Sequence, residues 1–157
     1  MSAPDTGFWT WALEAYTRPG AAEACLELQD AFGQNVPYLL WAAWAAQTGR
    51  GLGGAELAAG ADLAGRWEAA ATGPLRAVRR ALKAFTPGIA DAAREALRAE
   101  VKALELKSEK LLMQALQGLA PVSGPTHDPN HALVDAVRAW PCLAPPSALA
   151  RLAQTLS

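Results

Sequence analysis

Hydrophobic residues recur every three to four positions along most of the chain, which is typical of helices packed on a shared core. Strand signals are nearly absent, because β-branched residues are scarce and Ala and Leu dominate between the Gly and Pro residues that punctuate the sequence. We therefore predict an all-α protein, an irregular bundle of about seven helices with one central apolar helix and one long amphipathic helix.

The central helix is predicted from Val36 to Thr48, with Asn35 as its N-cap. Large apolar side chains cover nearly its full circumference, as expected of a helix at the centre of a fold. The longest helix is predicted from Ala90 to Gly118 and would be about 40 Å long. Its apolar positions alternate in steps of four and three, interrupted only by Ser108, and they are Leu97, Val101, Leu104, Leu111 and Ala115.

Other helix boundaries follow from capping residues, Gly and Pro. We expect Thr6 to cap the first helix, Gly33 to end the second, and Gly73-Pro74 to break or kink a helix that begins after Gly54. A following amphipathic helix is expected to reach Phe85. Residues 121–127 are expected to form a loop, followed by two short helices that begin after Asp128-Pro129 and Pro145-Pro146.

Composition limits the class of protein. The 157 residues suit one domain over residues 1–157, and a chain that is 52% hydrophobic with six Trp is expected to fold. Fourteen basic and fifteen acidic side chains give a net charge of −1, which argues against nucleic acid as a partner. The first residues lack the features of a secretory signal, and the most apolar run, from Val36 to Ala46, is too short to span a membrane. We therefore expect a cytoplasmic protein.

Four cations spaced at i, i+3, i+4 and i+7 share one face of a predicted helix and form what we call the basic stripe: Arg76, Arg79, Arg80 and Lys83. One interpretation is that they are solvated and paired within the chain, with Glu23, Glu27 or Asp30 as the acids. The alternative is an acidic protein partner, a phosphate-bearing ligand or an RNA backbone.

The six Trp residues allow two interpretations, a packed core or a pocket with aromatic walls. A ligand pocket would be several hundred Å³ in size, with Gln29, Asp30 and Tyr38 among its polar groups. Trp9 and Trp11 lie about 200° apart on a helix, so one of the two is expected to point toward a different surface. An exposed Trp is a candidate interface anchor.

Three motifs resemble chemical sites but have simpler explanations. His127-Asp128-Pro129-Asn130-His131 contains metal-ligand residue types, yet Asp128 is placed to cap a helix, which leaves His127 outside it. Cys25 lies between Glu23 and Glu27, which disfavour a thiolate, so we expect an inert buried thiol, and we expect the same of Cys142. The loop from Gly49 to Gly54 follows a helix and lacks a Gly-Lys-Ser/Thr ending, so we expect a flexible connection.

The amino-acid sequence of the first three predicted helices, together with a few residues further along the chain, resembles a known family. The similar segments are Phe8-Trp9-Thr10-Trp11-Ala12-Leu13, Tyr16-Thr17-Arg18-Pro19-Gly20, Ala24-Cys25-Leu26-Glu27-Leu28-Gln29-Asp30, Asn35-Val36, Leu39-Leu40-Trp41, Trp67, Pro74-Leu75-Arg76 and Arg79-Arg80. This is a proteobacterial family of conserved hypothetical proteins, a domain of unknown function (family 2390 of that series). The resemblance covers residues 8–112 and leaves the C-terminal part, 119–157, unmatched. It implies a helical fold and supplies no catalytic residues.

No nucleophile–base pair, carboxylate dyad, metal site or cofactor motif stands out, so the sequence favours a non-enzymatic protein. We expect a protein-interaction or regulatory module that binds another protein, through the basic stripe, an exposed part of the long helix, and Trp9 or Trp11. The alternative is a small-molecule-binding protein or enzyme with a Trp-lined pocket.

Overall fold

The structure, a computed structural model, describes residues 7–157, which form eight α-helices and one π-helical turn. In chain order these are α1 (Phe8–Tyr16), α2 (Ala21–Phe32), α3 (Val36–Gln47), α4 (Gly54–Trp67), η1 (Glu68–Thr72), α5 (Gly73–Ala81), α6 (Asp91–Leu119), α7 (Pro129–Ala139) and α8 (Pro146–Leu156). Because α4, η1 and α5 run on without a break, the described part of the chain contains seven rods. The predicted all-α class and helix number are confirmed. The predicted cap at Thr6 lies outside the described residues.

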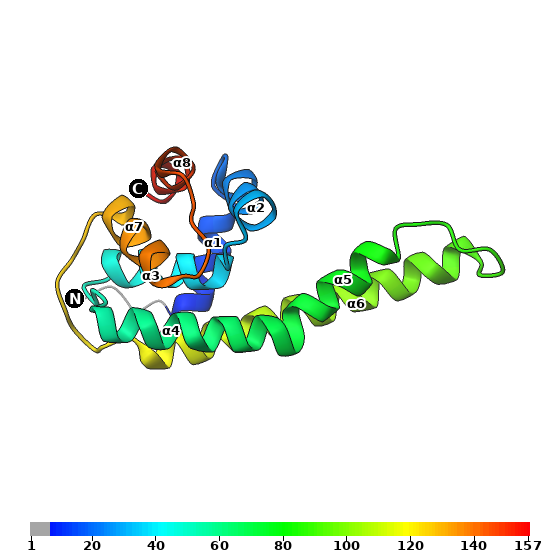
Figure 1. The fold of residues 1–157 in the computed structure, drawn as a ribbon, viewed down its shortest axis with the longest axis horizontal. Helices are drawn as coiled ribbons and strands as arrows, with labels where there is room; N and C mark the ends of the chain where they lie inside the picture. The colour runs from blue at the N-terminus through cyan, green and yellow to red at the C-terminus, as the bar shows by residue number, and fades with distance from the viewer. Residues whose placement is uncertain (1–6) are drawn as a thin grey trace.

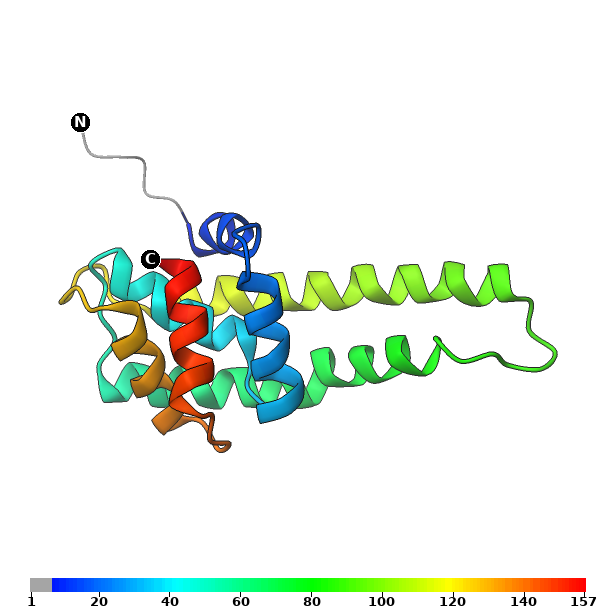
Figure 2. The ribbon, with the colours of Figure 1, turned by 90° about the horizontal axis from the view of Figure 1, so that it is seen from above.

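The rods divide into a body and an arm (Figures 1 and 2). The body holds α1 to α4, α7, α8 and the second half of α6, whereas α5 and the first half of α6 lie side by side and project from it. The arm therefore carries α5 and part of α6 away from the core. Within residues 7–157, no helix combines the length and the apolar character that crossing a membrane requires.

Helix α3 is central, as predicted. Every residue from Val36 to Ala46 is buried, and the Asn35 side chain accepts a hydrogen bond from the backbone N–H of Tyr38 at 3.0 Å. Around α3 pack α1, α2, α4, α6 and α7. The helix ends at Gln47, one residue before the predicted end at Thr48. A helix that is apolar on all sides is stable only where neighbours cover its whole circumference, and here they do.

At Gly73-Pro74, where a break or a kink is predicted, the chain forms a π-helical turn. Pro74 has no N–H to donate to the preceding turn, and the N–H of Gly73 bonds to the carbonyl of Glu68, five residues back. A Cβ atom at Gly73 would lie 2.7 Å from that carbonyl oxygen, so only glycine fits. The chain therefore bends without ending the helix, which carries α5 into the arm.

The prediction that the basic helix reaches Phe85 is wrong. Helix α5 ends at Ala81, and residues 82–90 form the tip of the arm. Pro87 disfavours helical backbone at Thr86, and the Phe85 side chain is 70% exposed because no other element covers it. The long helix agrees with prediction to within one residue at each end.

The loop from Gly49 to Gly54 connects two helices, as predicted. Backbone hydrogen bonds join it to residues 121–127, which were also predicted to form a loop. The N–H of Gly51 donates to the carbonyl of Pro125 at 2.9 Å, and the N–H of Gly124 donates to that of Gly49 at 2.7 Å. A Cβ atom at Gly51 would lie 2.2 Å from the Pro125 oxygen. Glycine here permits close backbone approach.

Candidate binding site

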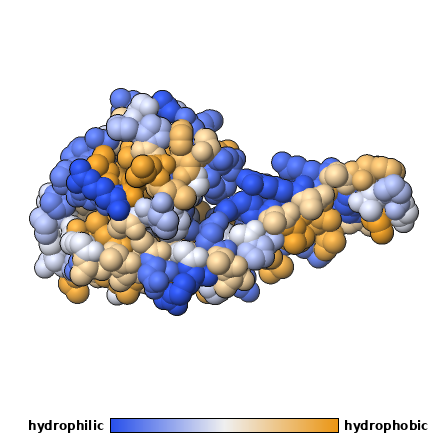
Figure 3. All heavy atoms as spheres, viewed as in Figure 1, coloured by the Kyte–Doolittle hydropathy of each residue, from blue (hydrophilic) through white to orange (hydrophobic). Residues whose placement is uncertain are grey.

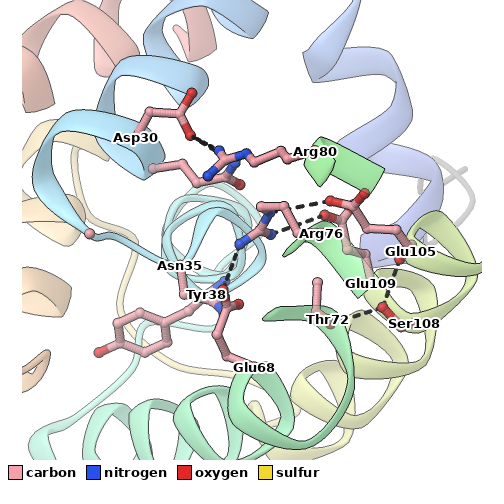
Figure 4. Close-up of polar contacts among 12 residues, drawn as sticks. Asp30, Asn35, Tyr38, Glu68, Thr72, Arg76, Arg80, Glu105, Ser108 and Glu109 are labelled. Atoms are coloured by element: carbon pink, nitrogen blue, oxygen red, sulfur yellow. Dashed lines mark hydrogen bonds and ion pairs between the residues drawn. The ribbon is translucent and has the colours of Figure 1, made fainter. Parts of the chain in front are cut away.

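Three of the four residues of the basic stripe form ion pairs with acidic side chains (Figure 4). Arg76 Nη1 lies 2.6 Å from Glu68, and its Nε lies 3.2 Å from Glu105. Arg79 donates to the same Glu105. Arg80 reaches Asp30 of α2 at 2.7 Å. Lys83 is exposed at the start of the arm tip, and no ion pair links it to another described residue.

Pairing within the chain was one of the two interpretations of this stripe, but most of the acids differ from those expected. Asp30 pairs with Arg80 as considered, whereas Glu27 pairs with Arg151 of α8 at 2.6 Å. Glu23 has no ion pair within the described range. The principal acids come from η1 and α6, whose side chains were not expected to pair with those of α5.

We call Glu68, Arg76, Arg79, Glu105 and Glu109 the ion cluster. Only 9% of the Glu105 side chain and 11% of the Arg76 side chain are exposed. Burial alone would lower the pKa of Arg76, but the nearby carboxylates outweigh it and raise that pKa above its ordinary value. A buried cluster of this kind holds its partners in place because leaving any one of the charges unpaired is costly.

Hydrogen bonds brace the ion cluster on both sides. Asn35, the cap of α3, donates from its side chain to Glu68 at 3.0 Å. The hydroxyls of Thr72 and Ser108 lie 2.8 Å apart and join η1 to α6. The indole N–H of Trp67 donates to the carbonyl of Ser108 at 2.8 Å. Ser108, the interruption in the apolar pattern of the long helix, thus faces its neighbour helix as part of a polar contact.

Glu109 is the least satisfied carboxylate of the ion cluster. Two guanidinium groups face three carboxylates, and Glu68 and Glu105 take the hydrogen bonds. Glu109 has one ion pair among the described residues, with Arg76 Nη2 at 3.9 Å. Burial, and then repulsion by Glu105, raises the pKa of Glu109 to about 7. Near neutral pH this carboxyl is therefore protonated in part of the molecules.

Glu109 also lines a pocket of about 180 Å³ where α6 meets α1, α2 and α3. Its other lining residues are mostly apolar: Trp9, Ala12, Leu13, Tyr16, Gln29, Val36, Pro37, Leu40, Leu106 and Met113. A wider groove of about 610 Å³ between α2 and the arm shares Tyr16, Leu106 and Glu109 with the pocket. The pocket therefore connects with an open surface at its Glu109 end.

Trp9 and Trp11 point to different surroundings, as predicted. Trp11 is 9% exposed and packs in the core against Phe8, with 6.4 Å between ring centroids. Trp9 is half-buried and forms a wall of the pocket, with Lys110 Nζ 5.4 Å from its ring centroid.

The pocket only partly matches the Trp-lined site considered from sequence. Gln29 does line it, but Asp30 is paired with Arg80, and Tyr38 is fully buried, where its hydroxyl donates to the carbonyl of Ala136 at 2.9 Å. Trp41 and Trp44 are completely buried and fill the core. The α6 residues of the pocket, Leu106, Glu109 and Met113, were missed, and the only sequence signal near them was the break in apolar spacing at Ser108.

The two cysteines differ. Cys25 is buried as predicted, and burial raises the pKa of its thiol to about 12, so it remains a thiol. The prediction that Cys142 is likewise buried is wrong, because it lies exposed in the connection between α7 and α8.

Asp128 caps α7 as predicted, accepting from the N–H of His131 at 3.2 Å. Residues 7–157 contain no group of three or more side chains placed to hold a metal ion.

An apolar surface runs along the arm on the flank that faces away from α2. On α6, Leu97, Leu104 and Leu111 recur every seven residues and are each about half exposed, although their spacing favours a buried stripe. The α6 residues that are buried instead include Glu105 and Leu112, each one position after a leucine of this row. On α5, the apolar side chains of Leu75, Val78 and Leu82 lie on the side opposite Arg80, which reaches α2.

We call this surface the arm face, and it consists of Leu75, Val78, Leu82, Leu97, Leu104 and Leu111. Figure 3 shows apolar side chains along the lower edge of the arm and hydrophilic ones on the edge toward α2. Beside Leu111 the surface continues into a shallow groove of about 150 Å³ that Leu63 and Trp67 also line.

Comparison with known proteins identifies a family without an assigned activity. No curated protein and no solved structure matches the chain. A family model described as a protein of unknown function (DUF2390) matches residues 7–116, a range that contains the ion cluster, the pocket and the arm. That match spans more than half of the chain and agrees with the resemblance seen in its first three helices, so the chain belongs to the DUF2390 family.

Proposed function

We propose that this protein is a non-enzymatic protein-interaction module that binds through the arm face. The observation that carries the proposal is the row of half-exposed leucines at positions 97, 104 and 111, on a helix that leaves the body. Contiguous exposed apolar surface on a soluble domain usually marks an interaction site. The ion cluster supports the role because it fixes α5 against α6 and so presents the face as one rigid surface.

The partner we propose is a second copy of this chain. If two α6 helices pack antiparallel with Leu104 at the twofold axis, Leu97 of one copy lies beside Leu111 of the other. The same register places Glu100 next to Lys107 of the partner copy, on the same side of the contact. This register therefore pairs leucine with leucine and opposite charges with each other, as an isologous dimer requires.

This arrangement would also cover the arm tip. Antiparallel packing brings the tip of each arm, with Phe85 70% exposed and Ile89 53% exposed, toward the groove that Leu63 and Trp67 line on the other copy. Burial of these side chains would stabilise the dimer by about 25 cal/mol for each Å² of apolar surface removed from water. Two hairpins joined in this way form a four-helix bundle.

The basic stripe and the two N-terminal Trp residues take other parts in this proposal than those expected from sequence. Arg76 and Arg79 are held by Glu105, so they order the arm. Arg80 and Lys83 lie at the polar edge of the arm, on the other side from the arm face, and are not part of the proposed contact. Trp9 and Trp11 lie on the body, away from the arm face.

The oligomeric state in solution tests the proposal. We expect light scattering after size exclusion to give twice the 16.5 kDa chain mass, and Leu104→Glu to give the monomer. Leu26→Glu is the matched control, because Leu26 is 51% exposed and Leu104 is 52% exposed, but Leu26 lies on α2. A wild-type chain that stays monomeric at the highest soluble concentration would overturn the choice of partner.

Charge exchange tests the register. Glu100→Lys and Lys107→Glu should each weaken self-association, because like charges would meet across the twofold axis. The double variant Glu100→Lys, Lys107→Glu should restore it. Weakening by the double variant as strong as the sum of the single effects would rule out the antiparallel register.

A further inference from the structure

The pocket beside Glu109 does not belong to the arm face, and its chemistry points to a ligand. Four helices contribute its walls, and nearly all of the lining side chains are apolar. Its volume of about 180 Å³ exceeds the roughly 150 Å³ of an engineered apolar cavity that binds benzene. The pocket therefore has room for a benzene-sized apolar group and a small polar substituent.

Three polar side chains reach this pocket, from three different helices. Tyr16 comes from α1, Gln29 from α2 and Glu109 from α6. The amide nitrogen of Gln29 donates to Asp30 at 3.3 Å, and its carbonyl oxygen accepts no hydrogen bond from another described group. Burial raises the pKa of Tyr16 to about 12, so its hydroxyl stays neutral.

Charge selects the kind of substituent. Arg76 and Arg79 donate their hydrogen bonds to Glu68 and Glu105. Glu109 is left with a single ion pair among the described residues, with Arg76 at 3.9 Å. A positively charged group beside Glu109 would supply the cation that the ion cluster lacks, since three carboxylates there face two guanidinium groups. An anionic group would add a fourth negative charge to the same site.

Aromatic side chains favour the same class of ligand. Trp9 and Tyr16 both line the pocket, and the faces of such rings attract organic cations. Lys110 already places its ammonium 5.4 Å from the centroid of the Trp9 ring, so a cation is compatible with these surroundings. The open groove at the Glu109 end gives a hydrophilic substituent a route to water.

We infer that the pocket binds a small primary ammonium compound with an apolar body of about benzene size, with Glu109 accepting the ammonium hydrogen bonds and Trp9, Leu40 and Met113 enclosing the apolar body. This inference does not depend on the arm face or on dimer formation. It identifies a ligand-binding site that has a defined charge preference and a defined size.

Binding of three probes of one size tests the inference: benzylammonium, benzyl alcohol and benzoate. The readout is the indole N–H resonance of Trp9 in the labelled full-length chain, assigned by comparison with Trp9→Phe. We expect benzylammonium to bind roughly tenfold or more tightly than benzyl alcohol, as a charge-assisted hydrogen bond predicts, and benzoate to bind weakest. Equal affinity for all three would overturn the charge preference.

Two variants separate the carboxylate from the apolar walls. Glu109→Gln should remove the preference for benzylammonium over benzyl alcohol while keeping binding of the alcohol. Glu14→Gln is the matched control, because Glu14 is exposed on α1 and does not line the pocket. Unchanged preference in Glu109→Gln would disprove the assigned role of Glu109. Methylammonium, which lacks the apolar body, should not shift the Trp9 resonance, and binding as tight as that of benzylammonium would disprove the role of the walls.

Discussion

Glu105 Oε1 lies 3.2 Å from Arg76 Nε in a contact from which water is nearly excluded, because 9% of one side chain and 11% of the other are exposed. This ion pair joins α6 to α5 where the arm leaves the body. It places a charged residue in the middle of the buried face of the longest helix. Because α6 turns the face with Glu105 toward α5, the arm takes its direction from this contact and the arm face is left exposed.

Removing one partner of this pair should destabilise the protein strongly. We expect Glu105→Gln to lower the free energy of unfolding by about 3 kcal/mol, because it leaves two guanidinium groups without their shared carboxylate. Urea denaturation measures the change. Asp30→Asn is the control, since it breaks the half-exposed pair with Arg80 and should cost less than about 1 kcal/mol. Equal small effects would show that the buried pair contributes little.

Much of the fold could be predicted from local pattern. The all-round apolar character of residues 36–46 indicates a central helix, and Gly and Pro mark most helix ends, because these signals act through the backbone of a few neighbouring residues. The bend at Gly73 was predicted only as a break or a kink. A π-helical turn depends on how two long segments pack on α6, and local propensity does not contain that information.

The candidate site was harder to predict, because its residues meet only in three dimensions. The spacing of Leu97, Leu104 and Leu111 favours burial of that stripe, yet Arg76 and Arg79 draw the neighbouring face with Glu105 inward instead. Leaving Arg76 or Glu105 buried without a partner would cost about 3 to 5 kcal/mol, whereas each leucine forgoes only about 1 kcal/mol of burial by staying half exposed. The ordering of these two costs becomes visible only when the partner helix is known.

Two glycines on α4 provide a matched test of how α4 packs on α3. A Cβ atom at Gly60 would lie 2.3 Å from the ring of Trp41, whereas one at Gly65 would meet no atom within 4 Å. We expect Gly60→Ala to destabilise the protein by about 1 to 3 kcal/mol through overpacking. Gly65→Ala should stabilise it by about 0.5 to 1 kcal/mol, because alanine favours the helix. Thermal unfolding of both variants measures the contrast, and stabilisation by both would contradict the close approach.

The two cysteines should differ in reactivity within one molecule. Cys142 is exposed and should react with a thiol reagent in the folded protein, whereas Cys25 should react only after unfolding. Mass spectrometry should count one label per chain in the native sample and two labels per chain in the urea-denatured sample. Rapid labelling of Cys25 in the native state would show that α2 opens readily from the body.

Glu109 should make the stability of the protein depend on pH between about 4.5 and about 7. Its pKa in the folded protein is raised to about 7 from the ordinary value of 4.5, chiefly by burial. As pH rises through this window the unfolded chain loses the proton first, so the folded state loses stability relative to a variant that cannot ionise. We expect the difference in free energy of unfolding between wild type and Glu109→Gln to change by about 3 kcal/mol in favour of the variant, with the change complete about one pH unit above 7. Urea denaturation from pH 4 to pH 9 measures it, and Glu14→Gln, on the exposed surface of α1, should show no such trend.

A difference that stays constant over the whole range would mean that Glu109 is solvated in the folded protein. The same series with saturating benzylammonium should show a smaller effect, because the ammonium favours the ionised carboxylate and stabilises the wild type more than the variant.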